Sequence, residues 1–174
     1  MELRFAESKI HYYASKYSLD YDGNIEQLVP RVKQRGCLTK YDLVELSDWM
    51  LGFHRPHEVE SNQRNIERNS DSAIETITRS VLTDDSLHCL YDLEPLSGVS
   101  EVLGSAILHW FHKDPYPICS RPALSAVQID EQSPLSFHRW RTYVKFCRDI
   151  AQRNNVEMRI LDRSFMSFSQ EDVN

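Results

Sequence analysis

The sequence predicts an all-α protein, and three observations support this. Apolar residues recur at spacings of three and four along most of the 174 residues, which is the period of an amphipathic helix. Only five glycines and seven prolines are present, fewer than the turns of an all-β fold require. Ser, Thr or Asp precedes several apolar runs, as a helix N-cap would. We expect one compact helical domain of about nine helices over residues 1–168, followed by a polar tail at residues 169–174.

The first third of the chain is expected to form three helices. The apolar spacing predicts a helix over residues 3–17 and a second over residues 24–35, closed by Gly36. A third helix follows Thr39, which is placed to act as its N-cap. The stretch at residues 52–63 contains glycine and proline, and a loop is therefore expected there.

In the middle of the chain, a polar helix is expected at residues 58–69. Ser70 or Asp71 then caps the apolar run that follows. Thr83 is expected to cap a short helix that leads into the sequence LSGVS, residues 96–100.

Four helices are expected after that turn. They cover residues 100–112, 121–128, 133–155 and 157–169, and Pro134 lies in the first turn of the long one.

Composition limits the function classes. No apolar run reaches the ~18 residues of a membrane-spanning helix, and the N-terminus lacks a secretory signal, so we expect a cytoplasmic protein with no membrane partner. Four cysteines form no CxxC pair, which predicts separate buried thiols and neither a zinc nor an iron–sulfur site.

The net charge is −6, but residues 113–163 carry nine basic and six acidic side chains. A local basic face could therefore contact phosphate.

The turn LSGVS has the features of an anion site. Pro95 prevents a simple continuation of the preceding helix, Gly98 can adopt a positive φ, and Ser100 can cap the next helix. The amides of residues 98–102 would then point outward at a positive helix end, where a phosphate binds well. Such a turn grips DNA without reading its sequence.

Two segments carry a family resemblance. LSGVSEVLGSAIL resembles the L-P-G-V-G-x-x-T-A-x-x-I-L hairpin of the helix–hairpin–helix DNA glycosylase superfamily, and YPICSRPALSAV resembles its V-P-V-V-D-T-N-V-x-R-V segment. The match covers about residues 74–128, and LDRSF at residues 161–165 is similar to the last helix of small bacterial proteins of this type. The resemblance implies a helix–hairpin–helix motif, double-stranded DNA held between helical lobes, and base extrusion into a pocket.

The chain departs from the family at its catalytic positions. Val102 stands where bifunctional members carry a lysine, and Ser120 stands where members carry an aspartate. A serine hydroxyl does not stabilise an oxocarbenium ion as a carboxylate does. Ser120 and Asp162 are the candidate catalytic residues, and whether the chain is an enzyme stays open.

The expected DNA contacts fall into a backbone set and a charged set. The backbone set is Gly98, Val99, Ser100 and Glu101, and the charged set is Lys113, Arg121, Arg139 and Arg141, with His112 nearby. Solvated surface charge is the alternative for the charged set.

Other interpretations remain open at this point. Tyr116 could stack on an extruded base or could pack beside its neighbouring prolines. The pair His109 and His112 has the spacing of metal ligands, but no third ligand accompanies it, and we expect no metal and no cofactor. The three tryptophans are interpreted as core. The competing function is a non-catalytic helical module that binds DNA or a protein partner, in repair or in defence against phages.

Overall fold

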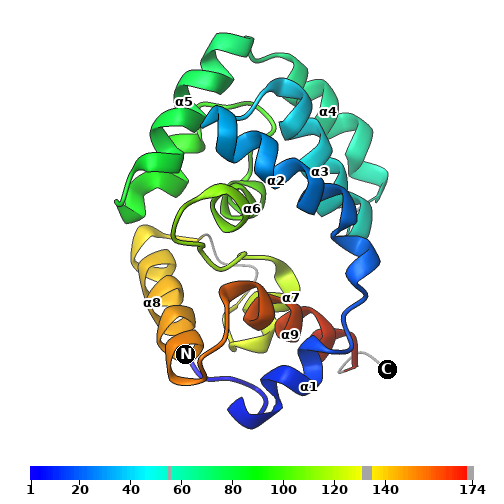
Figure 1. The fold of residues 1–174 in the computed structure, drawn as a ribbon, viewed down its shortest axis with the longest axis vertical. Helices are drawn as coiled ribbons and strands as arrows, with labels where there is room; N and C mark the ends of the chain where they lie inside the picture. The colour runs from blue at the N-terminus through cyan, green and yellow to red at the C-terminus, as the bar shows by residue number, and fades with distance from the viewer. Residues whose placement is uncertain (55, 131–134, 172–174) are drawn as a thin grey trace. The chain divides into compact units, whose positions relative to one another are not determined.

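The computed structural model confirms the all-α class (Figure 1). It describes residues 1–54, 56–130 and 135–171, and over these ranges the chain forms nine α-helices, four 3-10 helices and no strand. The chain divides into two compact units. The terminal unit consists of Met1–Ser18 and Tyr116–Asn174, and the central unit is Leu19–Pro115.

The central unit contains five α-helices: α2 (Gly23–Arg35), α3 (Lys40–His54), α4 (Val59–Glu67), α5 (Asp71–Thr83) and α6 (Glu101–Phe111). Short 3-10 helices η2 (Leu19–Tyr21), η3 (Pro56–Glu58) and η4 (Leu87–Leu93) connect them. Helix α3 packs against α2, α4 and α6, and η4 packs against α5 and α6. Fully buried leucines and isoleucines on these faces form the core of the unit.

The caps of the central unit were largely predictable. The amide of Asp42 donates to Thr39 Oγ1 while Asp42 Oδ2 accepts from the amide of Thr39, which makes a reciprocal cap at the start of α3. Ser70 caps α5 by accepting from the amide of Ala73 at 3.2 Å. The amide of Gly36 donates to the carbonyl of Val32 and closes α2, as predicted.

Two local predictions in this unit were wrong. The loop expected at residues 52–63 is mostly helical, because α3 continues to His54, η3 covers Pro56–Glu58 and α4 begins at Val59. Thr83 does not start a helix: it ends α5, and its hydroxyl donates to the carbonyl of Arg79, while Ser86 caps η4. Pro134 and residue 55 lie outside the described residues.

The terminal unit contains α1 (Ile10–Ala14), α7 (Arg121–Ala126), α8 (Phe137–Arg153) and α9 (Met158–Glu171), with η1 (Glu7–Lys9) before α1. Both α1 and α7 pack against α9, and Figure 1 shows α1 beside α9. An aromatic cluster joins the two ends of the chain: the rings of Phe5 and Phe168 lie 5.0 Å apart, and those of Tyr13 and Phe168 lie 5.3 Å apart.

The ends of the chain differ from the expectation in detail. The helix predicted over residues 3–17 is shorter in the structure. It begins at Glu7 with the 3-10 turn η1, and α1 ends at Ala14. Helix α9 continues to Glu171, into the expected tail. Among the residues that the structure describes, no helix has both the length and the apolar character needed to cross a membrane.

Candidate nucleic-acid interface

The turn at residues 96–100 joins η4 to α6. The amide of Val99 donates to the carbonyl of Leu96 at 3.1 Å, so residues 96–99 form a hydrogen-bonded β-turn. Gly98 is the third residue of this turn and has φ +82°, the value that a type II turn requires at that position. The positive φ predicted for Gly98 is therefore present.

Asn69, which follows α4, holds the turn in place. Its Oδ1 accepts from the amide of Ser97, and its Nδ2 donates to the carbonyls of Ser97 and Ile66, all at 2.9 Å. One side chain thus satisfies both backbone groups of Ser97, 28 residues away. Asn69 was not predicted from the sequence, since a single distant asparagine leaves no periodic signal.

Gly98 also allows the turn to approach α4 closely. A Cβ at this position would lie 2.8 Å from Ile66 Cγ1, 3.0 Å from the amide nitrogen of Ile66 and 3.2 Å from the carbonyl oxygen of Asn62. In α6, a Cβ on Gly104 would lie 2.9 Å from Leu90 Cδ1, so this helix packs closely on η4. The turn is held against α4 by the close approach of Gly98 and by the hydrogen bonds of Asn69.

The outer face of the turn is open to solvent. Ser97, Ser100 and Glu101 are exposed, while Leu96 is buried beneath them. Ser100 caps α6 as predicted, its Oγ accepting from the amide of Leu103 at 3.3 Å. The Val99 amide is used within the turn, so the donors that this face can offer an anion come from the N-terminal end of α6.

The charge around the turn is negative. Asp92, Glu94 and Glu101 flank it and are exposed. The central unit carries nine basic and 17 acidic side chains, a formal charge of −8, whereas the terminal unit carries 11 and nine, a charge of +2. The excess of basic over acidic side chains therefore lies in the terminal unit.

The four predicted charged contacts differ in their surroundings. Lys113 pairs with Asp85 at 2.7 Å, and the hydrogen bond between them lowers the pKa of Asp85 and raises that of Lys113. Arg139 donates from Nη2 to the carbonyl of Asp130 at 2.7 Å. Arg121, the first residue of α7, and Arg141, on α8, are both exposed. Only Lys113 belongs to the central unit.

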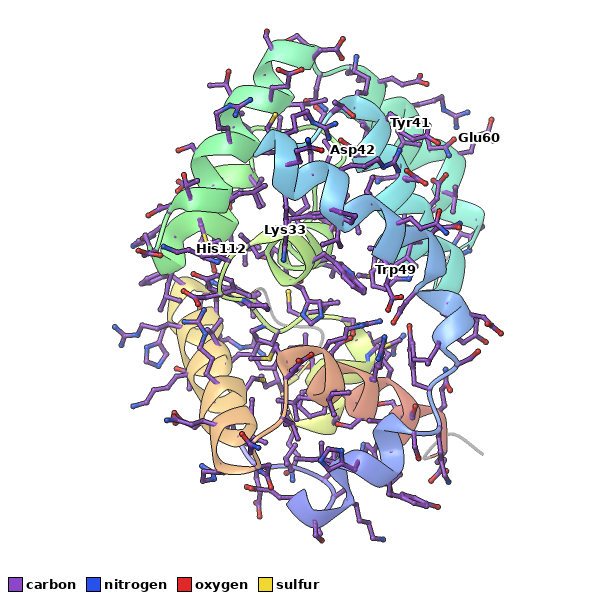
Figure 2. The ribbon with its side chains drawn as sticks, viewed as in Figure 1. Lys33, Tyr41, Asp42, Trp49, Glu60 and His112 are labelled. Atoms are coloured by element: carbon purple, nitrogen blue, oxygen red, sulfur yellow. The ribbon has the colours of Figure 1, made fainter. Side chains whose placement is uncertain are left out.

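His112 does not fit the expectation of a phosphate contact, because it is 1% exposed. Its Nδ1 accepts from the amide of Asp114 at 3.0 Å, which leaves the proton on Nε2 to be donated to the carbonyl of Asp84 at 2.8 Å. His112, labelled in Figure 2, therefore ties the end of α6 to the end of α5.

The two candidate catalytic residues are both buried in the terminal unit. Ser120 is 2% exposed and caps α7, its Oγ accepting from the amide of Ala123 at 3.4 Å and lying 3.7 Å from the sulfur of Met166. Asp162 is 3% exposed and forms an ion pair with Arg159. Internal contacts thus hold both groups, and neither shares a unit with the turn.

The aromatic residues are mainly structural. Tyr116 is 1% exposed and stacks on Trp140, with ring centroids 5.8 Å apart and planes at 15°, which supports the packing interpretation. Trp140 is fully buried, as predicted for a core residue. Trp49 and Trp110 are only half-buried and meet edge to face at 5.8 Å; Trp49 is labelled in Figure 2.

The thiols behave as predicted. All four cysteines are reduced and buried, and burial raises the pKa of Cys147. Over the described part of the chain, no three His, Cys, Asp or Glu side chains gather as metal ligands would.

Comparison with protein-family models, with curated proteins and with solved structures finds no match to this chain.

Proposed function

We propose that this protein binds double-stranded DNA through the phosphate backbone, with the turn at residues 96–100 as one contact. The observation that carries the proposal is the turn itself. Gly98 at φ +82° is locked onto α4, and exposed Ser97 and Ser100 stand at the N-terminal end of α6. A rigid turn before a helix N-terminus suits an anion, because its donors are oriented before binding.

The proposal concerns binding, not base excision. Cleavage of an N-glycosidic bond calls for a carboxylate or an activated nucleophile beside the base. Ser120 is used as a helix cap, and Asp162 is paired with Arg159. The resemblance to glycosylases supports duplex DNA as the partner, since the hairpin segment keeps the first glycine of the family pattern at Gly98, while Ser100 stands at the second.

The turn alone supplies little affinity. Three exposed carboxylates flank it, and like charge beside a phosphate opposes contact. We therefore expect weak binding that does not depend on sequence and that decreases steeply with salt, because phosphate contacts release counterions.

The test is binding of a labelled 20-base-pair duplex in 50 and 200 mM salt, with a second duplex that carries an abasic-site mimic. The variant is Ser97→Asp, which adds charge to the exposed side of the turn and leaves the backbone contacts with Asn69 possible. Ser80→Asp, at an exposed position of α5, is the matched control.

We expect Ser97→Asp to weaken binding about fivefold, the effect of about one phosphate contact, while Ser80→Asp binds as the unchanged protein does. Equal effects of the two variants on binding would show that the turn is not part of the DNA interface. If the unchanged protein shows no salt-sensitive binding to either duplex, DNA is not its ligand.

A further inference from the structure

The outward face of α8 carries a row of basic side chains. His138, Arg141, Lys145 and Arg148 follow one another at spacings of three, four and three residues, so they lie within about 80° of one another around the helix. The first three are exposed and Arg148 is half-buried. We call these four residues the α8 stripe.

The opposite face of α8 is mainly apolar and is buried in the core. Five residues of this face are each at most 1% exposed: Trp140, Tyr143, Val144, Cys147 and Ile150. The helix is therefore fixed in rotation, and the α8 stripe is held outward by the burial of its other side.

We propose that the α8 stripe binds the phosphate backbone of duplex DNA, separately from the turn at residues 96–100; this inference rests on the proposed function. From residue 138 to residue 148 the stripe rises about 15 Å along the helix. A DNA strand carries one phosphate charge for every ~3.4 Å of helix axis. The stripe is therefore long enough for its side chains to reach more than one phosphate.

The cations of the stripe are available for such a contact. Among the residues with described positions, neither Arg141 nor Lys145 has a carboxylate within ion-pair distance. Asp149 shares the exposed side of the helix. Arg153, beyond the stripe, is paired with Glu7 at 2.6 Å and so contributes less to a new partner.

Arg148 is oriented before binding. The Cζ of its guanidinium lies 4.5 Å from the centre of the Tyr116 ring, and Tyr116 is itself stacked on buried Trp140. Ordering this side chain on a phosphate therefore costs less conformational entropy than ordering a free arginine.

The surroundings favour nucleic acid over a lipid surface. Helices that bind membranes insert an apolar face beside their cations. Here the apolar face is buried, and the exposed neighbours of the stripe are Thr142, Asp149 and Gln152. A regular row of cations without exposed apolar side chains is suited to a repeating row of phosphates.

The test compares two double variants of the full-length protein. Arg141→Gln with Lys145→Gln removes two charges from the stripe. Lys9→Gln with Lys33→Gln removes two charges from exposed positions elsewhere; Lys33 is labelled in Figure 2. Affinity for the 20-base-pair duplex is measured from 50 to 300 mM salt, and thermal unfolding confirms that both variants are folded.

Each phosphate contact changes the slope of log affinity against log salt by ~0.9, which is about fivefold in affinity at 0.15 M salt. Loss of two contacts should weaken binding about 30-fold and reduce the slope by ~1.8, whereas the control should change affinity less than threefold. If the unchanged protein binds duplex and both double variants bind alike, the α8 stripe is excluded and the proposed function stands.

Two further outcomes separate the alternatives. If the unchanged protein does not bind duplex, the proposed function fails and this inference fails with it. If it binds vesicles of phosphatidylcholine with 30% phosphatidylserine through the stripe but not duplex, the partner is an anionic lipid surface and the proposal is overturned.

Discussion

Replacement of Gly98 by alanine is expected to destabilise the protein by about 2–5 kcal/mol. Two separate effects contribute. A side chain at φ +82° costs about 1–2 kcal/mol relative to glycine. The new Cβ would also lie 2.8 Å from Ile66 Cγ1 and 3.0 Å from the backbone nitrogen of Ile66, and crowding of this kind costs about 1–3 kcal/mol.

Two other glycines separate these effects in urea unfolding experiments. Gly36 has φ +72°, but its nearest neighbour would be the flexible end of Arg79 at 3.4 Å, so Gly36→Ala reports the backbone cost alone. Gly52 lies within α3 with nothing within 4 Å, and Gly52→Ala should stabilise by about 0.5–1 kcal/mol.

Gly98→Ala should lower the free energy of unfolding more than Gly36→Ala does, whereas Gly52→Ala should raise it. If Gly98→Ala is no worse than Gly36→Ala, the close contact between the turn and α4 does not exist in solution.

Three further predictions follow from the same contacts. Asn69→Ala removes three hydrogen bonds and should cost about 1–3 kcal/mol in urea unfolding, while exposed Asn24→Ala should have little effect; equal effects would contradict the role of Asn69. Burial raises the pKa of Cys147 and of Tyr143, so both side chains are neutral in the folded protein. As the pH rises, the unfolded chain loses these protons first, near the ordinary pKa values of 9.0 for cysteine and 10.0 for tyrosine. These two groups therefore leave the free energy of unfolding unchanged below pH 9, lower it by about 1.4 kcal/mol per pH unit from pH 9 to pH 10, and lower it about twice as steeply above pH 10. A free energy of unfolding that does not change up to pH 11 would disprove this. Finally, a thiol reagent at pH 8 should label none of the four buried cysteines in the native protein and all four in denaturant, and rapid native labelling would refute their burial.

Helix ends were predictable where one side chain decides them. Ser70 and Ser100 cap their helices because a hydroxyl beside an apolar run has a nearby amide to accept from. Thr83 was predicted to cap the next helix, but it is the last residue of α5, and Ser86, three residues later, caps η4 instead. Gly52 misled the interpretation, because a helix tolerates one glycine at ~1 kcal/mol when its other residues are well packed.

The candidate interface was predictable in part. Gly98 and its positive φ follow from the local sequence, whereas Asn69 acts across 28 residues and has no local signature. The α8 stripe was visible in the sequence as basic residues at spacings of three and four. The spacing alone does not show which face of the helix is outward; only burial of the apolar face shows which basic residues face solvent.

The net charge of −6 is a poor guide to the partner of this chain, because the charge is divided unevenly. All of the excess acid lies in the central unit, and the α8 stripe lies in the terminal unit. At 0.15 M salt the Debye length is about 8 Å, so carboxylates farther than this from a bound phosphate repel it weakly, while direct contacts keep most of their strength. Local arrangement therefore outweighs the total charge in physiological salt. Near 10 mM salt the Debye length rises to about 30 Å, and repulsion from the net charge of −6 then opposes the gain from counterion release. The plot of log affinity against log salt should accordingly flatten at low salt, which a protein with a uniformly basic surface would not show.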